Sequence, residues 1–197
     1  MMRWHRSDPP PPLLRWAPEL TEAFIAERSA NPSHRFRWAQ RAGVNLGEVI
    51  REALEVQNHG HCCYCDAYPI GAAGRQEVDH FRPKSRFPEA VYDWANLYLG
   101  CTACNSVKAD QWDEDLLRSD AADYEFQRYF VVDGVTGAIA PNSLASPAEQ
   151  QRARRTIEVF DLDSKDRRIA RRKTIRAPDF EASPNERAYR FLYFDTD

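Results

Sequence analysis

The sequence contains no long hydrophobic run, because no segment reaches 18 consecutive apolar residues, about the length that a membrane-spanning helix needs. The first residues, MMRWHRSDPPPPLLRW, also lack the apolar centre of a secretory signal peptide. We therefore expect a soluble, cytoplasmic protein. With 197 residues, the chain is long enough to form one domain around its own hydrophobic core.

The chain has little net charge, formally −3, but its charges are unevenly distributed. Residues 110–125 include seven acidic and one basic side chain, whereas residues 150–176 include ten basic and four acidic ones. A clustered basic face can bind nucleic acid even when the whole protein is nearly neutral. The alternative is that these arginine-rich helices are simply solvated.

Cysteine is absent from most of the chain. All five cysteines lie in two short stretches, with Cys62, Cys63 and Cys65 in the first and Cys101 and Cys104 in the second. Disulfides are rare in the cytosol, so paired cysteines there indicate metal or redox chemistry. Two Cys-x-x-Cys pairs supply four thiolates, the ligand set of a closed structural zinc site, whereas a redox pair typically stands alone. We predict zinc bound by Cys62, Cys65, Cys101 and Cys104, with Cys63 left over.

Hydrophobic spacing and capping residues predict an α+β fold that is mainly helical. A proline run at 9–12 predicts an extended leader. In the pattern over 34–59, Gly43 and Gly47 weaken the helical signal. The predicted helices cover 18–30, about 34–59, about 101–110, 147–160 and about 163–176. A strand is predicted over 76–81 and a hairpin over 129–132 and 138–140. The aromatic segment 188–194 fits either a helix or a strand. We divide the chain into 1–60, 61–110 and 111–197.

The segment between the two cysteine pairs carries the residues that suggest chemistry. Asp79 and His80 place a hard oxygen ligand beside an imidazole that can act as a base near neutral pH. Arg82, Lys84 and Arg86 follow at alternate positions, which in an extended segment would put them on one side as a track for phosphates.

Each of these residues also has a purely structural interpretation. An Asp-His pair is more often a hydrogen-bonded structural pair than a catalytic one. Asn96 could only cap the next turn, and Lys108 could be a solvated helix residue. Their occurrence together within one interval of fewer than fifty residues favours a common functional site.

The order of these motifs resembles a known family. Cys-x-x-Cys, Asp-His, Asn-Leu and Cys-x-x-Cys-Asn-x-x-Lys follow one another from Cys62 to Lys108, about a quarter of the chain, as in the HNH (His-Me finger) endonucleases with a ββα-metal core and a four-cysteine zinc. The segments MRWHRSDPPPPLLRW and VDHFRPKSRFP…YDWANLYLGCTACNSVK further resemble one subgroup, the PtuB-like HNH proteins found beside ATPases in Septu-type and retron-linked antiphage systems.

The resemblance implies a role for each matching residue. Asp79 and Asn105 would hold a catalytic Mg²⁺ or Mn²⁺, and His80 would be the general base that deprotonates the attacking water. Asn96 would orient His80, and Lys108 would contact a phosphate near the cleaved bond. Asn105 stands where the family more often has histidine, and its harder oxygen donor should favour Mg²⁺ or Mn²⁺ over softer metals.

For the whole chain, the resemblance implies a metal-dependent endonuclease that hydrolyses phosphodiester bonds, with DNA favoured over RNA as the substrate. It would act as the effector of an antiphage system together with a PtuA-like ATPase. Residues 1–60 would then dock the partner, residues 61–110 would form the nuclease core, and the basic helices of 111–197 would carry the substrate. The alternative is a zinc-stabilised module that binds nucleic acid or protein without catalysis.

Overall fold

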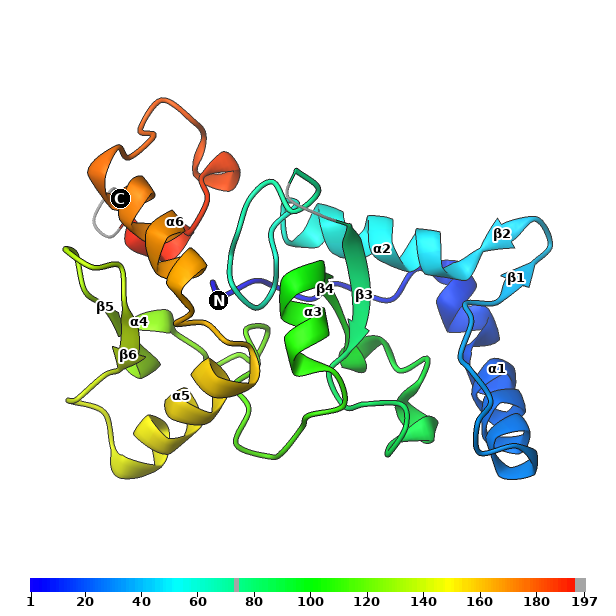
Figure 1. Ribbon diagram of the computed structural model, residues 1–197. Helices are drawn as coiled ribbons and strands as arrows, with labels where there is room; N and C mark the ends of the chain where they lie inside the picture. Colours follow the sequence, from blue (N-terminus) through cyan, green and yellow to red (C-terminus); the bar gives the residue numbers. More distant parts are fainter. Residues whose placement is uncertain (73–74, 194–197) are drawn as a thin grey trace.

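A computed structural model describes residues 1–72 and 75–193, and its architecture is α+β as expected (Figure 1). Short 3₁₀ turns lie at Pro88–Ala90, Trp94–Asn96, Pro184–Glu186 and Arg190–Leu192. No helix within these ranges is long and apolar enough to cross a membrane. The other elements are α1 (Pro11–Ala30), β1 (Gln40–Arg41), β2 (Val44–Asn45), α2 (Leu46–Gln57), β3 (Gln76–His80), β4 (Leu97–Cys101), α3 (Thr102–Lys108), α4 (Phe126–Tyr129), β5 (Phe130–Val132), β6 (Ile139–Pro141), α5 (Pro147–Val159) and α6 (Lys165–Arg176).

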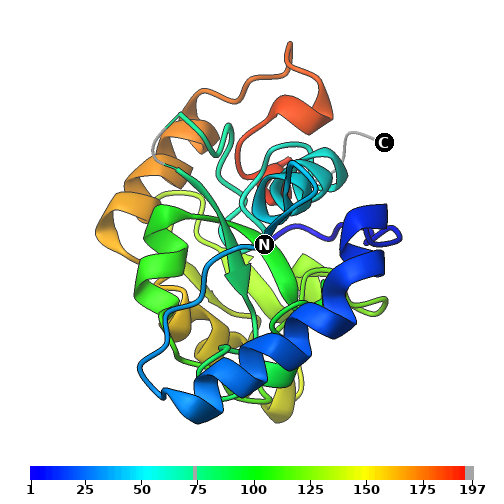
Figure 2. The same ribbon diagram turned by 90° about the vertical axis from the view of Figure 1, so that its right-hand side faces the viewer.

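The antiparallel pair β3–β4 and the helix α3 occupy the middle of the molecule, as Figure 1 shows. Helix α1 and the hairpin β1–β2 lie on one side, and α4 to α6 with the hairpin β5–β6 lie on the other. Figure 2 shows α1 crossing the outer face of the molecule on the side where α1 and the hairpin β1–β2 lie. The buried hydrophobic residues run from Met1 to Phe191 as one continuous cluster, so both flanking groups share a core with the central unit.

The first helix begins earlier than the sequence predicted. It starts at Pro11, with Pro10 in an extended conformation at the N-cap, so Pro18 lies inside the helix rather than at its start. Proline suits the first helical turn because its fixed φ fits the helix and its missing N–H would have no partner there. The end of the proline run therefore begins the helix instead of standing apart as an extended leader.

The helix predicted over residues 34–59 is wrong in its first half. The chain has no regular secondary structure from His34 to Ala39, forms the hairpin β1–β2, and becomes helical only at Leu46. Gly43 lies in the hairpin turn with φ of +79°, a conformation that favours glycine. Asn45 caps α2, since its side chain accepts hydrogen bonds from the N–H groups of the first helical turn.

Most of the remaining predictions of local structure are confirmed. Strand β3, helix α3 and the hairpin β5–β6 lie where expected. Helix α5 begins with a complete capping box between Ser146 and Glu149. Helix α6 begins after Ser164, and Asp163 accepts hydrogen bonds from Arg168 and the Ile139 N–H instead of capping the helix. The undecided segment 188–194 contains only a short 3₁₀ turn up to residue 193, and Phe194 lies outside the described residues.

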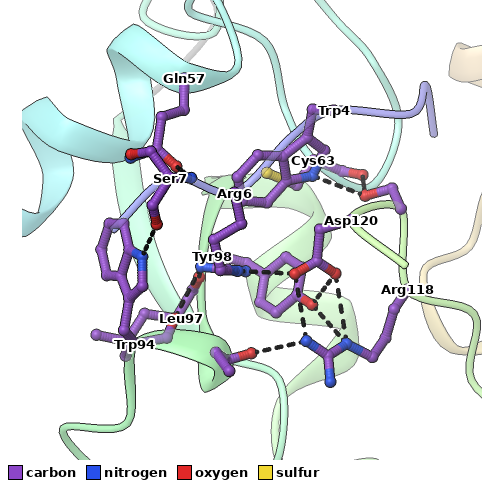
Figure 3. A network of polar contacts seen from close by, with 12 residues as sticks. Trp4, Arg6, Ser7, Gln57, Cys63, Trp94, Leu97, Tyr98, Arg118 and Asp120 are labelled. Carbon is purple, nitrogen blue, oxygen red and sulfur yellow. Dashed lines mark hydrogen bonds and ion pairs between the residues drawn. The ribbon is translucent and has the colours of Figure 1, made fainter. Parts of the chain in front are cut away.

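Trp4 and Arg6 anchor the N-terminal segment to the core (Figure 3), whereas Arg3, His5 and Ser7 are exposed. Trp4 is buried and its indole N–H donates to the Ser119 hydroxyl at 3.0 Å. The Arg6 guanidinium donates to Asp120 at 2.7 Å and to the carbonyl oxygens of Trp94 and Leu97 at 2.7 and 3.0 Å. This segment therefore fixes the chain that leads into β4.

Asp120 is the anion on which this network converges. Tyr98 donates its hydroxyl to one carboxylate oxygen at 2.5 Å, and Arg118 forms an ion pair with the other at 3.2 Å. Burial alone would raise the pKa of Asp120, but its two arginine partners and the tyrosine hydroxyl lower it below the usual value. The carboxylate is therefore held ionised inside the protein.

Replacing Arg6 tests whether the N-terminal segment holds the fold. We expect Arg6→Ala to lower the free energy of unfolding by about 3 kcal/mol, because it removes one partner of a buried ion pair. The exposed pair Arg41–Glu19 is the control, and Arg41→Ala should leave stability nearly unchanged. Urea denaturation measures both variants.

The difference in the free energy of unfolding between wild type and Arg6→Ala should depend on pH in a defined direction. The folded-state pKa of Asp120 is lowered, so its stabilising contribution is present above its unfolded pKa of about 4 and is lost as pH falls through the folded value. The difference between wild type and Arg6→Ala should therefore shrink in acid. A difference that stays constant below this range would contradict the assignment to the ion pair.

Candidate functional site

The four predicted zinc ligands come together. The Sγ atoms of Cys62, Cys65, Cys101 and Cys104 all lie within 4.8 Å of one another, and those of Cys65 and Cys101 are 3.9 Å apart. A tetrahedral zinc with bonds of about 2.3 Å to sulfur requires sulfur atoms about 3.8 Å apart. The geometry and the ligand chemistry therefore both fit zinc.

Two short knuckles from distant parts of the chain build this cluster. Cys62 and Cys65 follow α2, while Cys101 ends β4 and Cys104 lies in α3. The backbone N–H of Cys101 donates to the Cys62 sulfur at 3.3 Å. Asp66, with φ of +60°, closes the first knuckle through its N–H bond to the Cys62 carbonyl.

A cation from the far end of the chain contacts the cluster. The guanidinium of Arg167, on α6, donates to the Cys104 sulfur at 3.1 Å. Burial would lower the pKa of Arg167, but the negative charge of the thiolates outweighs it and raises the pKa. Burial also raises the pKa of Cys62 and Cys104, so their thiolate forms need compensating positive charge. No local signal in the sequence pointed to Arg167.

Cys63 does not belong to the cluster, as expected from its spacing. Its thiol accepts a hydrogen bond from the Asn58 side chain at 3.3 Å, and its N–H donates to the Leu99 carbonyl. Burial raises the pKa of Cys63 to about 12, so the thiol remains protonated at neutral pH. Cys63 thus differs from its neighbours in both position and chemistry.

Asp79 and His80 end strand β3, and as neighbours on a strand they point to opposite faces. The Asp79 carboxylate accepts a hydrogen bond from the Tyr64 hydroxyl at 2.5 Å and pairs with the Lys108 ammonium at 3.1 Å. Burial raises the pKa of Asp79, while Lys108 and the tyrosine hydroxyl act in the opposite direction. The carboxylate therefore has strong partners on the face that α3 covers.

Lys108 is fully buried, unlike the solvated residue that was one interpretation of the sequence. Its ammonium also donates to the His80 carbonyl at 2.7 Å. This places a positive charge against Asp79, at the carboxylate predicted to hold a divalent cation. A phosphate contact by Lys108 requires the ammonium to leave this pair or to share it.

The imidazole of His80 is held in one tautomer. Its Nε2 lies 2.9 Å from the Val91 carbonyl oxygen, which can only accept, so Nε2 carries the proton and Nδ1 carries a lone pair. Burial, together with the nearby Lys84 and Lys108 ammonium groups, lowers the pKa of His80 to about 3, while the Val91 carbonyl acts in the opposite direction. The ring is therefore neutral at neutral pH, as a general base must be.

Aromatic side chains pack against the imidazole ring of His80. Its ring stacks on Trp38 with centroids 5.5 Å apart and an interplanar angle of 12°, and the edge contact with Phe36 is 5.2 Å. The residue is only 4% exposed. Both aromatic residues come from the irregular segment before β1, where the sequence predicted a helix, so sequence reasoning missed them.

Asn96 lies where it can hold the chain around His80. Its side chain accepts from the Arg82 N–H at 2.7 Å and donates to the carbonyl oxygens of Arg82 and Ala90 at 3.1 and 3.0 Å. These groups lie two residues after His80 and one residue before Val91, whose carbonyl binds the imidazole. An orienting role for Asn96 through the backbone fits this geometry.

Asn105 faces strand β3, where it contacts an acid that the sequence analysis did not single out. Its amide donates to the carboxylate of Glu77, which lies two residues before Asp79 and on the same face of the strand. The alternation of the strand was the signal that could have identified Glu77. Asp79, Asn105 and Glu77 supply the oxygen donors that Mg²⁺ and Mn²⁺ prefer, so the donor chemistry of this face fits such an ion.

The predicted phosphate track of Arg82, Lys84 and Arg86 is not a single row. The segment turns rather than extends, because the N–H groups of Arg86 and Phe87 both donate to the Pro83 carbonyl. The guanidinium groups of Arg82 and Arg86 lie 5.5 and 5.7 Å from the ring centroid of Trp112. The ammonium of Lys84 instead lies 5.6 Å from the ring centroid of Phe36, which contacts His80. Only Lys84 therefore lies on the His80 side.

Many of the basic residues in 150–176 have internal partners. Arg155 pairs with Asp113, Arg168 pairs with Asp163, and Arg171 is buried against the carbonyl oxygens of Gly137 and Leu162. Within the described part of the chain, four exposed cations of this segment have no ion pair: Arg154, Lys165, Lys173 and Arg176. The basic segment is therefore partly structural and partly available to a ligand.

Comparison with known proteins gives one partial similarity. Over 108 residues, 55% of this chain, the sequence is 27% identical to the Septu protein PtuB of Bacillus thuringiensis. These residues cover 37% of that protein, so this chain spans little more than a third of the relative's length. No family model matches the chain.

The neighbouring cysteines provide a matched test of the metal centre. We expect Cys65→Ser to reduce bound zinc from about one ion per chain to nearly none and to destabilise the fold, because a closed site needs all four thiolates. Cys63→Ser should keep its zinc. Metal analysis and thermal unfolding of the two purified variants measure this, and equal zinc loss in both would contradict the assigned ligand set.

Proposed function

We propose that this protein is a metal-dependent endonuclease of the HNH type that hydrolyses phosphodiester bonds. The observation that carries the proposal is the state of His80, a neutral imidazole whose Nε2 is engaged and whose Nδ1 lone pair is left to accept a proton. His80 ends strand β3, and the antiparallel partner strand β4 runs directly into helix α3. The four-cysteine cluster ties these elements together.

The residues around His80 suit this chemistry. In the proposed reaction, Nδ1 takes the proton from a water molecule that attacks phosphorus. Asp79 and Asn105 would hold the Mg²⁺ or Mn²⁺ ion, with Glu77 beside them. A bound divalent ion would neutralise charge on the phosphate oxygens and assist departure of the 3′ oxygen. Lys84 and Lys108 add positive charge near the base.

The similarity to a Septu protein supports a role in antiphage defence. We propose that the chain acts as a Septu-type effector with a PtuA-like ATPase, on DNA more readily than on RNA. Trp4 and Arg6 are committed to contacts within the protein, so partner docking is assigned to the exposed part of residues 8–60. Leu14 on α1 is 68% exposed there and offers an apolar contact.

The second candidate is a zinc-stabilised binding module without catalysis. It is favoured by the burial of the Asp79–Lys108 pair and of His80, since a buried and satisfied set of this kind can serve the fold alone. Binding would then depend on the zinc cluster and the exposed cations, and would not depend on His80.

Replacing the proposed base separates the two candidates. We expect His80→Ala to reduce cleavage by about 10²–10⁴-fold while zinc content and folding stay normal, because only proton transfer is lost. His5→Ala, which removes an exposed histidine elsewhere, is the control and should cleave normally.

The assay uses plasmid DNA and tRNA with Mg²⁺ or Mn²⁺, with and without the ATPase partner. Cleavage by His80→Ala at the wild-type rate would contradict the assigned base. Equal nucleic-acid binding by both proteins, without any product in the presence of the partner, would favour the binding module.

The exposed cations of α6 provide a test of the substrate path. We expect Lys173→Gln and Arg176→Gln each to weaken nucleic-acid binding and to reduce the salt-dependence slope by about one, because each removes one phosphate contact. Arg168→Gln removes the same charge from a residue already paired with Asp163, so its slope should change less. Binding isotherms at several salt concentrations measure this, and slopes equal to the wild-type slope in Lys173→Gln and Arg176→Gln would exclude α6 from the path.

A further inference from the structure

We propose that Trp38, held against Gly47, is a positioning residue that fixes the plane of the His80 imidazole. The catalytic consequence rests on the proposed function, whereas the positioning itself does not. The proposal assigns a role to a residue of the irregular segment before β1, outside the interval between the two cysteine pairs.

The contacts of the imidazole show why its plane needs a second restraint. The hydrogen bond from Nε2 to the Val91 carbonyl fixes one atom of the ring, and the ring could still tilt about that bond. Trp38 lies nearly parallel to the imidazole, with a 12° angle between the planes, and Phe36 closes the edge at 86°. The stacked indole thereby sets the direction in which Nδ1 points.

Trp38 is itself held in a small ring of contacts. Its indole meets Phe36 at 4.8 Å and Tyr92 at 5.8 Å, both edge-on. The backbone that follows is tied to the start of α2, because the Leu46 N–H donates to the Ala39 carbonyl at 3.0 Å. The position of the indole is thus coupled to the first turn of α2.

Gly47 makes room for this arrangement. A Cβ atom added at Gly47 would lie 2.5 Å from both Cγ and Cδ1 of Trp38, and 2.9 Å from its Cβ. Since the tryptophan Cβ is among the clashing atoms, turning the indole alone cannot relieve the contact, and the segment carrying Trp38 must shift. Glycine weakens a helix, and its backbone here does not need positive φ, so close approach of the indole accounts for it.

The charged groups near His80 do not replace this restraint. Lys84 and Lys108 act on the ring electrostatically and Asp79 points to the opposite face of β3, and none of them bonds to the imidazole nitrogens. Stacking on Trp38 is therefore the contact that defines the ring plane. A small error in this plane is costly, because proton transfer depends on accurate alignment of the donor and acceptor atoms.

Four variants and a control test the proposal in the full chain. The variants are Gly47→Ala, Trp38→Leu, Trp38→Phe and the double variant of Gly47→Ala with Trp38→Leu, and the control is Gly134→Ala. An added Cβ at Gly134 meets nothing within 4 Å, so this control makes the same chemical change without a clash. The first readout is the proton spectrum of the His80 ring, assigned with His80→Ala, because a stacked indole shifts these resonances through its ring current. The second is kcat and KM for cleavage with the ATPase partner, with zinc content measured on each sample.

We expect Gly47→Ala and Trp38→Leu to move the His80 resonances and to lower kcat by about tenfold or more with little change in KM. Trp38→Phe, which retains a stacking ring, should recover much of the loss, and Gly47→Ala should add nothing in the Trp38→Leu background. Gly134→Ala should match wild type.

Unchanged His80 resonances in Trp38→Leu, or additive losses in the double variant, would overturn the proposal. Should Gly47→Ala fail to fold, the spectra of Trp38→Leu and Trp38→Phe decide it alone. Shifted resonances in a protein whose wild type cleaves nothing would leave the positioning role standing and reject the proposed nuclease function, so the two failures are distinguishable.

Discussion

The four-thiolate cluster is the constraint on which the rest of the structure depends. It joins a knuckle after α2 to the junction of β4 and α3, and so closes the chain around the segment that carries Asp79 and His80. A two-stranded sheet is marginally stable alone, and β3–β4 is such a sheet. The cluster also reaches the end of the chain, through Arg167 on Cys104 and through the pair between Asp66 and Arg190.

The predictable parts of the fold have local signals. The zinc ligands follow from cysteine spacing, and helix α5 follows from its capping box. The error over residues 34–45 arose because hydrophobic residues that contact His80 and the core happened to recur at helical spacing. Likewise, the sequence of the first seven residues does not show that Arg6 meets Asp120, since that contact joins positions 114 residues apart.

The candidate site likewise contains residues that the sequence could identify and residues that only the tertiary structure shows. Asp79, His80 and Asn96 were identifiable from their order between the cysteine pairs. The structure places Asp79 and His80 at the end of β3 and Asn96 in the 3₁₀ turn just before its partner β4. Trp38, Gly47 and their contact with the imidazole depend on tertiary packing. The number of basic residues alone was also a misleading sign of nucleic-acid binding. Many arginines in the basic segment are committed to internal ion pairs or carbonyl oxygens, as Arg171 is.

The central claim is that one ββα unit holds two separate centres, a thiolate cluster for structural zinc and an oxygen-donor face at Asp79 for a catalytic ion. Manganese binding to the zinc-loaded protein tests it most directly, by calorimetry on wild type and Asp79→Asn with zinc measured in the same samples. The account predicts about one exchangeable Mn²⁺ per wild-type chain, affinity reduced at least about tenfold in Asp79→Asn, and unchanged zinc in both. Equal Mn²⁺ binding by the two proteins, or loss of zinc from Asp79→Asn, would contradict it.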